Sequence, residues 1–479
     1  MDGVEESAPK RETGYSALAD RDAVLAALSL LIADAWASFE HPRPEEPALD
    51  EDLLERLALG LPEAPNDPAT VLADAARVLD ESVSPARPLY LAYVGSTGLE
   101  VGVLAAALAA TYDVNLAVTA RAADLVEKQA VGWVADFVGY PCAEGAFTSG
   151  GMISNLTALI AAREHALPGC RVDGFAGRSG AVYCSDESHH SVVRATEAAG
   201  IGSAFVRRIP IDANRRIVVG DLDHAIATDR EAGIVPVAVV ANGGTTLTGA
   251  VDPIDEIADI CERHRTWLHV DGAYGLPAAS TDTAAPLFAG LERADSVTLD
   301  AHKWLGLQKS CSLVLLRREG ALEAAFGHEE SYMRRGEAVH NAVERTLEYS
   351  RPLRSLKLWL AFRTHGAAAF RGWIEATLRL ARQLADELRD DDDFELLSEP
   401  TLSTVCFRHV ADGVADLDAH NTALATAIQD DGRVFLAAAL VDDKVCLRVC
   451  FVNFRTRPED VDFVLETVRE LGERVAAGA

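Results

Sequence analysis

The spacing of apolar residues changes along the chain and divides it into three predicted regions. From about Asp22 to Asp80, apolar residues recur at helical spacing, broken by the proline-containing stretches HPRPEEP and LPEAPND. This pattern predicts a small helical segment that follows a loose polar tail. We expect the tail and the helical segment together to occupy residues 1–86.

The second region, residues 87–345, alternates short apolar runs with amphipathic stretches such as IDEIADICERH. The runs predicted to be buried strands include AVYCS, PVAVVA, WLHVD, SVTLD and CSLVLL. Alternation of this kind is typical of βαβ units. It predicts a large α/β domain whose mainly parallel sheet has helices on both faces.

The third region, residues 346–479, begins with a long helix-rich stretch that we expect to bridge two domains. After the acidic run Asp390–Asp393, short strand-like runs alternate with two helical stretches. These runs are FELLS, STVCFR, VFLAAAL and KVCLRVCFV. The region is predicted to be a bridging helix followed by a small α+β C-terminal domain.

The charge balance excludes large anionic partners. The formal net charge is −30 and the pI is near 4.8, so nucleic acid and anionic membranes are repelled. Lysine and arginine number 44 together, but few of them are lysines. Arginine stays protonated, so a reaction that needs a neutral amine has few candidates. The candidates are Lys10, Lys128, Lys303, Lys309, Lys357 and Lys444.

Cysteine usage and apolar runs predict a cytoplasmic protein. The eight cysteines are scattered without a CxxC pair, which favours reduced, buried thiols. The N-terminal stretch is polar and acidic, with no apolar signal core. The apolar stretch from Val101 to Tyr112 is well short of the ~18 residues that suggest a membrane span.

Lys303 follows the predicted strand SVTLD, in the sequence DAHKW. Ligands of open α/β sheets collect at the carboxyl ends of the strands. A lysine in an apolar setting there, between His302 and Trp304, can lose its proton and form a Schiff base. The alternative is an ordinary surface lysine after a strand.

Asp271 ends the predicted strand WLHVD and is followed by the small residues Gly272 and Ala273. An acid at this position can bind a metal, cap a helix or pair with a cation. The small residues after it allow a flat ring to lie close to the backbone.

Gly150 and Gly151 open a predicted helix in the sequence FTSGGMISNLTALI. We expect Thr148 and Ser149 to offer N-cap hydroxyls, and the helix start to suit a phosphate. The alternative is a simple loop. The chain lacks the G-x-x-x-x-G-K-S/T pattern, which argues against a nucleotide triphosphatase.

The strand AVYCS leads into SDESHHS, which contains Asp186, His189 and His190. An imidazole there can stack on a ring, shuttle protons or bind a metal. Adjacent histidines on a regular element cannot both reach one ion, so we disfavour a metal site. A partly exposed loop histidine is the alternative, and it suits His190 better than His189.

These four signals fit one ligand. A phosphate site, a stacking imidazole, an acid for a ring nitrogen and a lysine for an aldehyde together indicate pyridoxal 5′-phosphate. The ordered motifs TSGG, SDESHHS, GGTT, HVDGAYG and DAHKW resemble the group II pyridoxal-phosphate-dependent amino acid decarboxylases, which include aromatic-amino-acid, histidine and glutamate decarboxylases. The resemblance runs from about Arg87 to Ala479 and implies the aspartate-aminotransferase-like fold type I and a homodimer.

The resemblance also implies the roles of individual residues. Lys303 is expected to form the Schiff base, Asp271 to partner the pyridinium nitrogen and His189 to stack on the cofactor ring. The helix start Gly150, Gly151 and Met152 is expected to bind the phosphate. Further cofactor contacts that it implies are Thr246, Ala273, Asp300 and His302. Tyr332 matches the catalytic tyrosine of a mobile loop, and the expected substrate-side residues are Tyr93, Ser96 and Arg448.

Two positions depart from the family pattern. Where members often have Asn-Pro before His-Lys, this chain has Asp300 and Ala301, and an ionised aspartate cannot donate to a phosphate. Val94 stands where members that act on aromatic substrates have phenylalanine. The first departure puts the phosphate contact of Asp300 in doubt, and the second puts an aromatic substrate in doubt.

The expected reaction is decarboxylation of an L-amino acid to the amine and CO₂, as in a carboxy-lyase. Alternatives on the same cofactor are carbon–carbon lysis and decarboxylation-coupled oxidative deamination by an aldehyde synthase. The presence of both His189 and Tyr332 favours simple decarboxylation. A non-catalytic, cofactor-binding partner protein is the alternative from another class, and it would be expected to lack Lys303 or Tyr332.

Overall fold

The computed structural model describes residues 18, 20–41, 51–95, 97–117, 120–328 and 342–478. Contacts divide the chain into two compact units, the described residues up to Ser84 and those from Pro85 onwards. Within these ranges, no helix has both the length and the apolar character needed to cross a membrane. The domain boundaries predicted at residues 86 and 345 stay predictions.

The first unit is helical, as its apolar spacing predicts. Its described helices are α1 (Arg21–Ser38), α2 (Glu51–Leu57) and α3 (Pro68–Asp80). α1 begins after Asp20, whose side chain accepts a hydrogen bond from the Ala23 N–H. α3 begins after Asp67, which accepts from the Thr70 N–H, and Pro68 fills its first position.

The second unit contains a seven-stranded sheet of order β1-β7-β6-β5-β4-β2-β3 among the described residues. β7 runs antiparallel to both of its neighbours, and the other pairs are parallel. The strands are β1 (Glu144–Thr148), β2 (Gly180–Ser185), β3 (Val206–Ile209), β4 (Val235–Asn242), β5 (Trp267–Asp271), β6 (Ser296–Asp300) and β7 (Ser312–Leu316). The predicted mainly parallel sheet is confirmed, and each of the five apolar runs predicted as a strand forms one.

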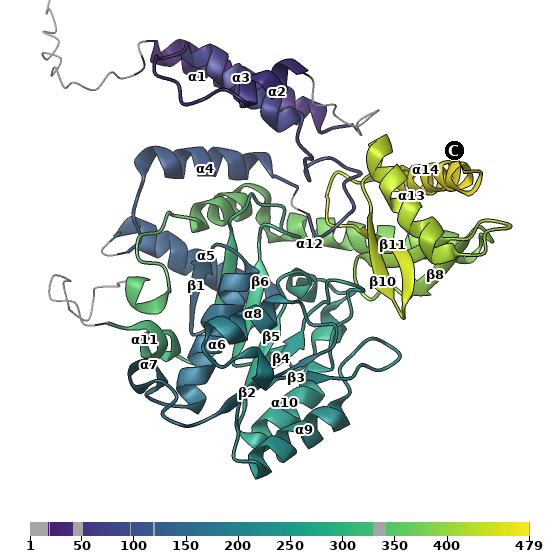
Figure 1. The fold of residues 1–479 in the computed structure, drawn as a ribbon. Coiled ribbons are helices and arrows are strands. Elements are labelled where there is room, and N and C mark those ends of the chain that lie inside the picture. The colour runs from purple at the N-terminus through teal and green to yellow at the C-terminus, as the bar shows by residue number, and fades with distance from the viewer. Residues whose placement is uncertain are drawn as a thin grey trace, which may run out of the picture. The chain divides into compact units, whose positions relative to one another are not determined.

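Helices cover both faces of this sheet (Figure 1). On one face α6, α8 and α11 pack against side chains such as Val182, Val240 and Val314. On the other, α5, α9, α10 and α12 pack against Tyr183, Val239 and Val270. The helices are α4 (Glu100–Tyr112), α5 (Ala122–Val138), α6 (Gly151–Ala166), α7 (Cys170–Asp173), α8 (Ser191–Ala198), α9 (Val219–Glu231), α10 (Ile254–His264), α11 (Ala321–Phe326) and α12 (Ser355–Arg389).

The small C-terminal domain has the predicted α+β character. Its antiparallel sheet has the order β10-β11-β9-β8. The elements are β8 (Phe394–Ser398), β9 (Thr404–His409), α13 (Leu417–Asp431), β10 (Ala437–Val441), β11 (Lys444–Cys450) and α14 (Glu459–Ala476). The long helix α12 leads into it and bends at Gly366, whose φ of 76° suits a residue without a side chain.

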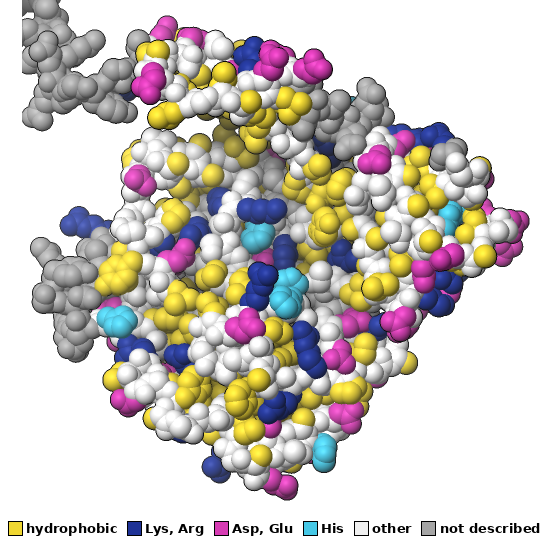
Figure 2. Space-filling view, viewed as in Figure 1, with side chains coloured by type: hydrophobic (Ala, Val, Ile, Leu, Met, Phe, Trp, Pro, Cys, Tyr) yellow, Lys and Arg dark blue, Asp and Glu magenta, His cyan; other side chains and the backbone are white. Residues whose placement is uncertain are grey.

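Acidic and basic side chains are mixed on the face of the molecule in Figure 2. It shows Asp and Glu side chains scattered over this face, with Lys and Arg side chains among them. Many arginines form exposed ion pairs, such as Arg263 with Asp223 at 2.7 Å. Exposed pairs contribute about 0–1 kcal/mol each, so they add little to the stability of the fold.

The ion pair between Arg351 and Glu127 is buried instead, and it ties α5 to the segment before α12. Arg351 donates to both carboxylate oxygens of Glu127, and the Arg351 side chain is only 1% exposed. The backbone of Arg351 is held as well, since its N–H donates to Asn115 and its carbonyl accepts from Leu116. Removing one partner from such a pair leaves a buried charge without compensation.

We therefore expect Glu127→Ala to lower the free energy of unfolding by about 3–5 kcal/mol. Arg263→Ala, which breaks an exposed pair, is the matched control and should cost less than about 1 kcal/mol. Urea unfolding followed by tryptophan fluorescence measures both variants. Similar losses in the two variants would contradict the special contribution of the buried pair.

Candidate active site

Lys303 lies in the turn after β6, at the carboxyl edge of the large sheet. Its Nζ is 3.1 Å from Oδ2 of Asp300, the last residue of that strand. The Lys303 side chain is 23% exposed, and its amine contacts the carboxylate. This is the strand-end position that the sequence predicts for it.

Asp300 is 2% exposed, and its Oδ1 has no hydrogen-bond partner among the described residues. The carboxylate also lies against the start of α6, because a Cβ added to Gly151 would be 2.9 Å from Asp300 Oδ2. The same added Cβ would be 3.1 Å from the Ala273 side chain. Glycine at position 151 thus lets the three segments meet.

His302 is partly buried beside Lys303, where its Nδ1 lies 3.1 Å from the Cys311 carbonyl oxygen. Its Nε2 is 3.8 Å from Asp300 Oδ2. Burial lowers the pKa of His302, and the neighbouring Asp300 carboxylate acts in the opposite direction. The ring therefore positions the lysine turn against β7 as a neutral group near pH 7.

Asp271 ends β5 and is 8% exposed. Its Oδ2 accepts a hydrogen bond of 2.8 Å from Asn155 Nδ2 on α6, and its Oδ1 accepts one of 3.2 Å from the Ala273 N–H. The predicted strand-end acid is therefore held in place by one donor to each of its oxygens.

A second histidine, His269, supports this arrangement from inside the sheet. Its Nε2 lies 3.0 Å from Asn155 Oδ1, and its Nδ1 lies 2.8 Å from Ser296 Oγ. Ser296 also accepts from the Trp267 indole N–H at 2.8 Å. Burial lowers the pKa of His269 to about 4, so the ring is neutral at pH 7 and donates from Nε2 to the amide oxygen. This donation leaves the Asn155 amide N–H groups pointing away from His269.

His189 lies on the other side of Asn155. Asn155 Nδ2 donates to Ser191 Oγ at 3.1 Å, and Ser191 Oγ is 2.8 Å from His189 Nδ1. The Ser191 N–H also donates to this ring nitrogen at 3.2 Å. Nδ1 is therefore the acceptor, and Nε2 carries the proton of the neutral ring.

The surroundings of His189 link it to the other candidate residues. Loss of contact with water lowers its pKa, and Lys303 acts in the same direction. Asp271 and Asp300 oppose this shift. His189 and His190 are both exposed, and the bond to Ser191 holds the His189 ring in place. Lys303, Asp271 and Asp300 all lie close enough to His189 for their charges to shift its pKa.

The start of α6 is open to a ligand, but not in the way the sequence predicts. The N-cap residue is Gly150, and no side chain caps the helix. Thr148, predicted as a capping hydroxyl, instead contacts Ser154 Oγ at 2.7 Å and the Gly150 carbonyl. An uncapped helix start keeps backbone N–H groups available for an anion. Met152 follows in the first turn and packs partly into the core.

Three of the remaining predicted residues, Thr246, Tyr93 and Arg448, lie in loops of the second unit or on the small domain. Thr246 is exposed in the loop after β4, and Tyr93 is 60% exposed with a φ of 54°. Arg448 on β11 is 5% exposed and donates from Nε to the carbonyl of Leu247, next to Thr246. Ser96 and Tyr332 lie outside the described residues.

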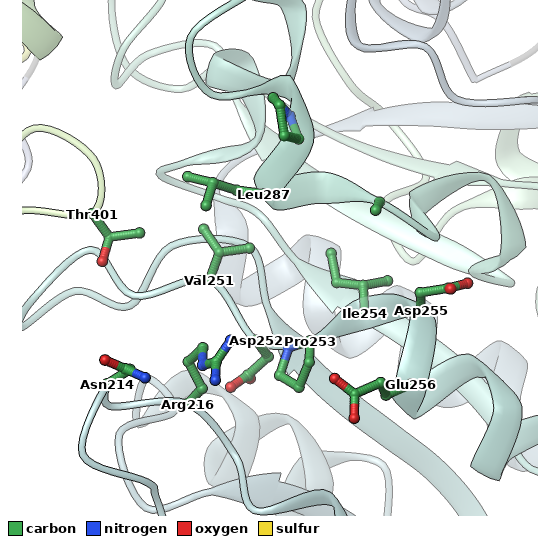
Figure 3. A pocket seen from close by; sticks show the side chains of 12 residues that line it. Asn214, Arg216, Val251, Asp252, Pro253, Ile254, Asp255, Glu256, Leu287 and Thr401 are labelled. Atoms are coloured by element: carbon green, nitrogen blue, oxygen red, sulfur yellow. The ribbon is translucent and has the colours of Figure 1, made fainter.

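A separate cavity of about 470 Å³ lies at the start of α10 (Figure 3). Asn214, Arg216, Val251, Leu287 and Thr401 are among its lining residues. None of the residues predicted for catalysis or cofactor binding lines it. The candidate active site is therefore defined by its side chains and not by this cavity.

Sequence reasoning missed Asn155, His269 and Ser191, although each has a signal in the sequence. Asn155 is a polar residue one helical turn after Gly151, on the face of α6 that is buried. His269 precedes Asp271 by two strand positions, which places both side chains on the same face of β5. Polar side chains on buried faces require partners, and here they become partners of one another.

Comparison with known proteins identifies the family of the chain. The family described as "Pyridoxal-dependent decarboxylase conserved domain" matches residues 51–410. The chain belongs to this family. The decarboxylase is 34% identical over 446 residues to an aromatic-L-amino-acid decarboxylase of Bacillus atrophaeus, covering 91% of this chain and 92% of that protein. It is also 34% identical over 289 residues to a cysteine sulfinic acid decarboxylase of Rattus norvegicus, covering 59% of each chain.

Solved structures of similar proteins have a similar fold. The structure of Oryza sativa TDC with PLP and tryptamine superposes with a TM-score of 0.89 at 26% identity, covering 95% of this chain and 98% of that chain. Mouse CSAD in apo form superposes with a TM-score of 0.88 at 27% identity, covering 94% and 98%. The predicted fold type I is confirmed, and the protein is a pyridoxal-phosphate-dependent amino acid decarboxylase, a carboxy-lyase.

The site fits the cofactor of the family. The uncapped start of α6 suits the phosphate, and the buried Asp271 suits a protonated ring nitrogen. Lys303 supplies an amine at the same sheet edge. These groups have the charges and donors that pyridoxal 5′-phosphate requires.

Asn155 offers a test of the buried network. We expect Asn155→Ala to weaken binding of pyridoxal 5′-phosphate about 10–100-fold, because Asp271 loses a buried donor worth about 1–3 kcal/mol. Absorbance titration of the cofactor-free protein measures the dissociation constant. Asn214→Ala, which removes an exposed amide from the separate cavity, is the control and should bind normally. Normal binding by the Asn155 variant would show that Asp271 does not need this donor.

Proposed function

We propose that this decarboxylase acts on a free L-amino acid at the edge of the large sheet, with Lys303 as the residue that bonds the cofactor's aldehyde. The observation that carries the proposal is the contact of its Nζ with Oδ2 of the buried Asp300 at 3.1 Å, on a side chain that is 23% exposed. His189, held by the Asn155 network, lies close enough to Lys303 for the charge of the lysine to lower the pKa of the imidazole. An amine, a buried acid and an imidazole therefore lie near one another.

Asp271 is proposed to hold the proton on the nitrogen of the cofactor ring. When bound, pyridoxal 5′-phosphate supplies a conjugated ring that accepts the electron pair left behind as CO₂ departs. The donors from Asn155 and Ala273 fix the direction of the Asp271 carboxylate. A negative carboxylate favours the protonated form of a ring nitrogen beside it.

His189 is proposed to lie against the ring. Its bond to Ser191 fixes the orientation of the imidazole and leaves its flat face available. Gly150, Gly151 and Met152 are proposed to hold the phosphate through the backbone at the start of α6. The resemblance to the family adds Thr246, Ala273 and His302 as further cofactor contacts.

The substrate side of the site is proposed on the resemblance alone. Tyr332 is expected to deliver a proton to the α-carbon, and Tyr93 and Ser96 to face the substrate. Arg448 is a buried arginine whose Nη2 has no hydrogen-bond partner among the described residues, so it retains donors for an anionic group. The two relatives are named for different substrates, an aromatic amino acid and cysteine sulfinic acid.

A homodimer is proposed on the apolar surface that the chain leaves exposed. α1 has no buried residue although it contains many leucine and alanine residues. On α4, Leu104 and Leu108 are about half exposed and Tyr112 is 77% exposed. Apolar helix faces of this kind mark interaction surfaces. A cytoplasmic location is also proposed, since all eight cysteines are free.

The central assignment is tested by fixing the cofactor to the protein. Borohydride reduction of the loaded enzyme should attach the cofactor to Lys303, and Lys303→Ala should abolish the attachment while leaving the fold intact. Lys309→Ala is the control, because this exposed lysine lies in the same loop. Peptide mapping by mass spectrometry locates the adduct. An adduct on Lys309 would refute the assignment.

The same preparations identify the substrate. Incubation with a panel that includes aromatic and acidic amino acids should release CO₂ and the corresponding amine from at least one of them. Product analysis under air distinguishes the amine from the aldehyde and ammonia of an oxidative deaminase. Aldehyde as the main product would favour the aldehyde synthase reaction instead.

Oligomeric state gives a separate prediction. Leu104→Asp together with Leu108→Asp places two charges in the exposed apolar face of α4, and should shift a dimer toward the monomer. Light scattering after size-exclusion chromatography measures the mass. Leu440→Asp, at a 61% exposed position in the small domain, is the control and should leave the mass unchanged. A wild-type monomer would refute the homodimer.

A further inference from the structure

Asp300 is a buried carboxylate that is only half satisfied. Oδ2 lies 3.1 Å from Lys303 Nζ, whereas Oδ1 has no hydrogen-bond partner among the described residues. The residue is 2% exposed, so water does not readily supply the missing bond. Buried polar atoms are nearly always bonded, and an exception therefore requires a reason.

The unpartnered oxygen lies where an anion is expected. The carboxylate contacts the position that a Cβ on Gly151 would occupy, at 2.9 Å from Oδ2 and 3.1 Å from Oδ1. Gly151 is the first residue of the 16-residue helix α6, whose uncapped start suits a phosphate. An ionised Asp300 would repel a phosphate there, whereas a protonated Asp300 could donate a hydrogen bond to it.

Lys303 must lose a proton before it can react, whereas Asp300 must gain one before it can donate to a phosphate. A lysine can bond a carbonyl carbon only as the neutral amine, so its ammonium must lose a proton first. The acceptor in direct contact with this ammonium is Asp300. Transfer of one proton from Lys303 to Asp300 would therefore give both the neutral amine and the protonated acid.

We propose that Asp300 takes the proton of Lys303 when the cofactor is captured, and then donates it in a hydrogen bond to the cofactor's phosphate. An N–H bond of Lys303 breaks and its electron pair stays on Nζ, while an O–H bond forms on Asp300. Ammonium and carboxylate become amine and carboxylic acid, with no net change in charge. The proposal rests on the role proposed above for Lys303.

Neighbouring titratable groups are less suited to this transfer. His302 is 3.8 Å from Oδ2, and its Nδ1 is already bonded to the Cys311 carbonyl. His189 is bonded through Nδ1 to Ser191. Burial lowers the pKa of both histidines and raises the pKa of the Cys311 thiol to about 12. Asp300 therefore remains the acceptor in contact with Lys303.

Infrared difference spectroscopy tests the proposal directly. Addition of pyridoxal 5′-phosphate to the cofactor-free protein should produce the carbonyl band of one new carboxylic acid, and Asp300→Asn should lack it. Asp282→Asn removes an exposed carboxylate from the same unit and should retain the band. A wild-type spectrum without a new acid band would overturn the proposal, whatever the activity of the enzyme.

The dissociation constant of pyridoxal 5′-phosphate provides a second readout. From about pH 6 to 9 a lysine is normally protonated, so Asp300→Asn should release one more proton on binding than the wild type. The ratio of wild-type to variant dissociation constants should then rise about tenfold per pH unit. A ratio that stays constant would overturn the proposal.

These outcomes are distinct from failure of the proposed function. Borohydride adducts mapped in the wild type and in Asp300→Asn show whether Lys303 bonds the cofactor at all. An adduct on another lysine refutes the role of Lys303, and the inference about Asp300 falls with it. An adduct on Lys303 without the acid band or the changing ratio refutes the inference alone.

Discussion

Two carboxylates, Asp271 and Asp300, are buried at the same edge of one sheet, and the rest of the site depends on how each is satisfied. A charge removed from water must be paired or bonded, or it becomes too costly to keep. Asp271 is bonded to uncharged donors and stays available for a cation. Asp300 has the Lys303 amine on one oxygen, and its other oxygen has no hydrogen-bond partner among the described residues. The neighbouring strands β5 and β6 thus end in two acids with different surroundings.

Asn155 connects the parts that surround Asp271. Its amide accepts a hydrogen bond from His269 and donates hydrogen bonds to Asp271 and Ser191. These contacts fix the direction of each hydrogen bond that Asn155 makes. The orientation of His189 follows from Ser191. A network in which each donor has an acceptor is rigid. This rigidity suits the positions beside a flat ring that are proposed for Asp271 and His189.

Much of the fold could be predicted from the sequence, because buried strands such as β5 and β6 are short apolar runs that end in polar residues. The same pattern located Lys303 and Asp271. The partners of these residues could not be predicted, since Asn155 and His269 come from other elements and meet only through the sheet order. The capping of α6 was predicted wrongly, because Thr148 contacts Ser154 Oγ and the Gly150 carbonyl instead of a backbone N–H at the helix start. The position of Tyr332 lies outside the described residues, so its role stays a prediction.

The antiparallel strand β7 has a consequence for how the protein folds during synthesis. β7 lies between β1 and β6, and Thr148 pairs with Ser312 across a long stretch of chain. β1 therefore has no neighbour in the sheet until β7 has left the ribosome, and loop closure over such a separation is slow. Until then β1 presents an open edge, the kind of surface on which chaperones act.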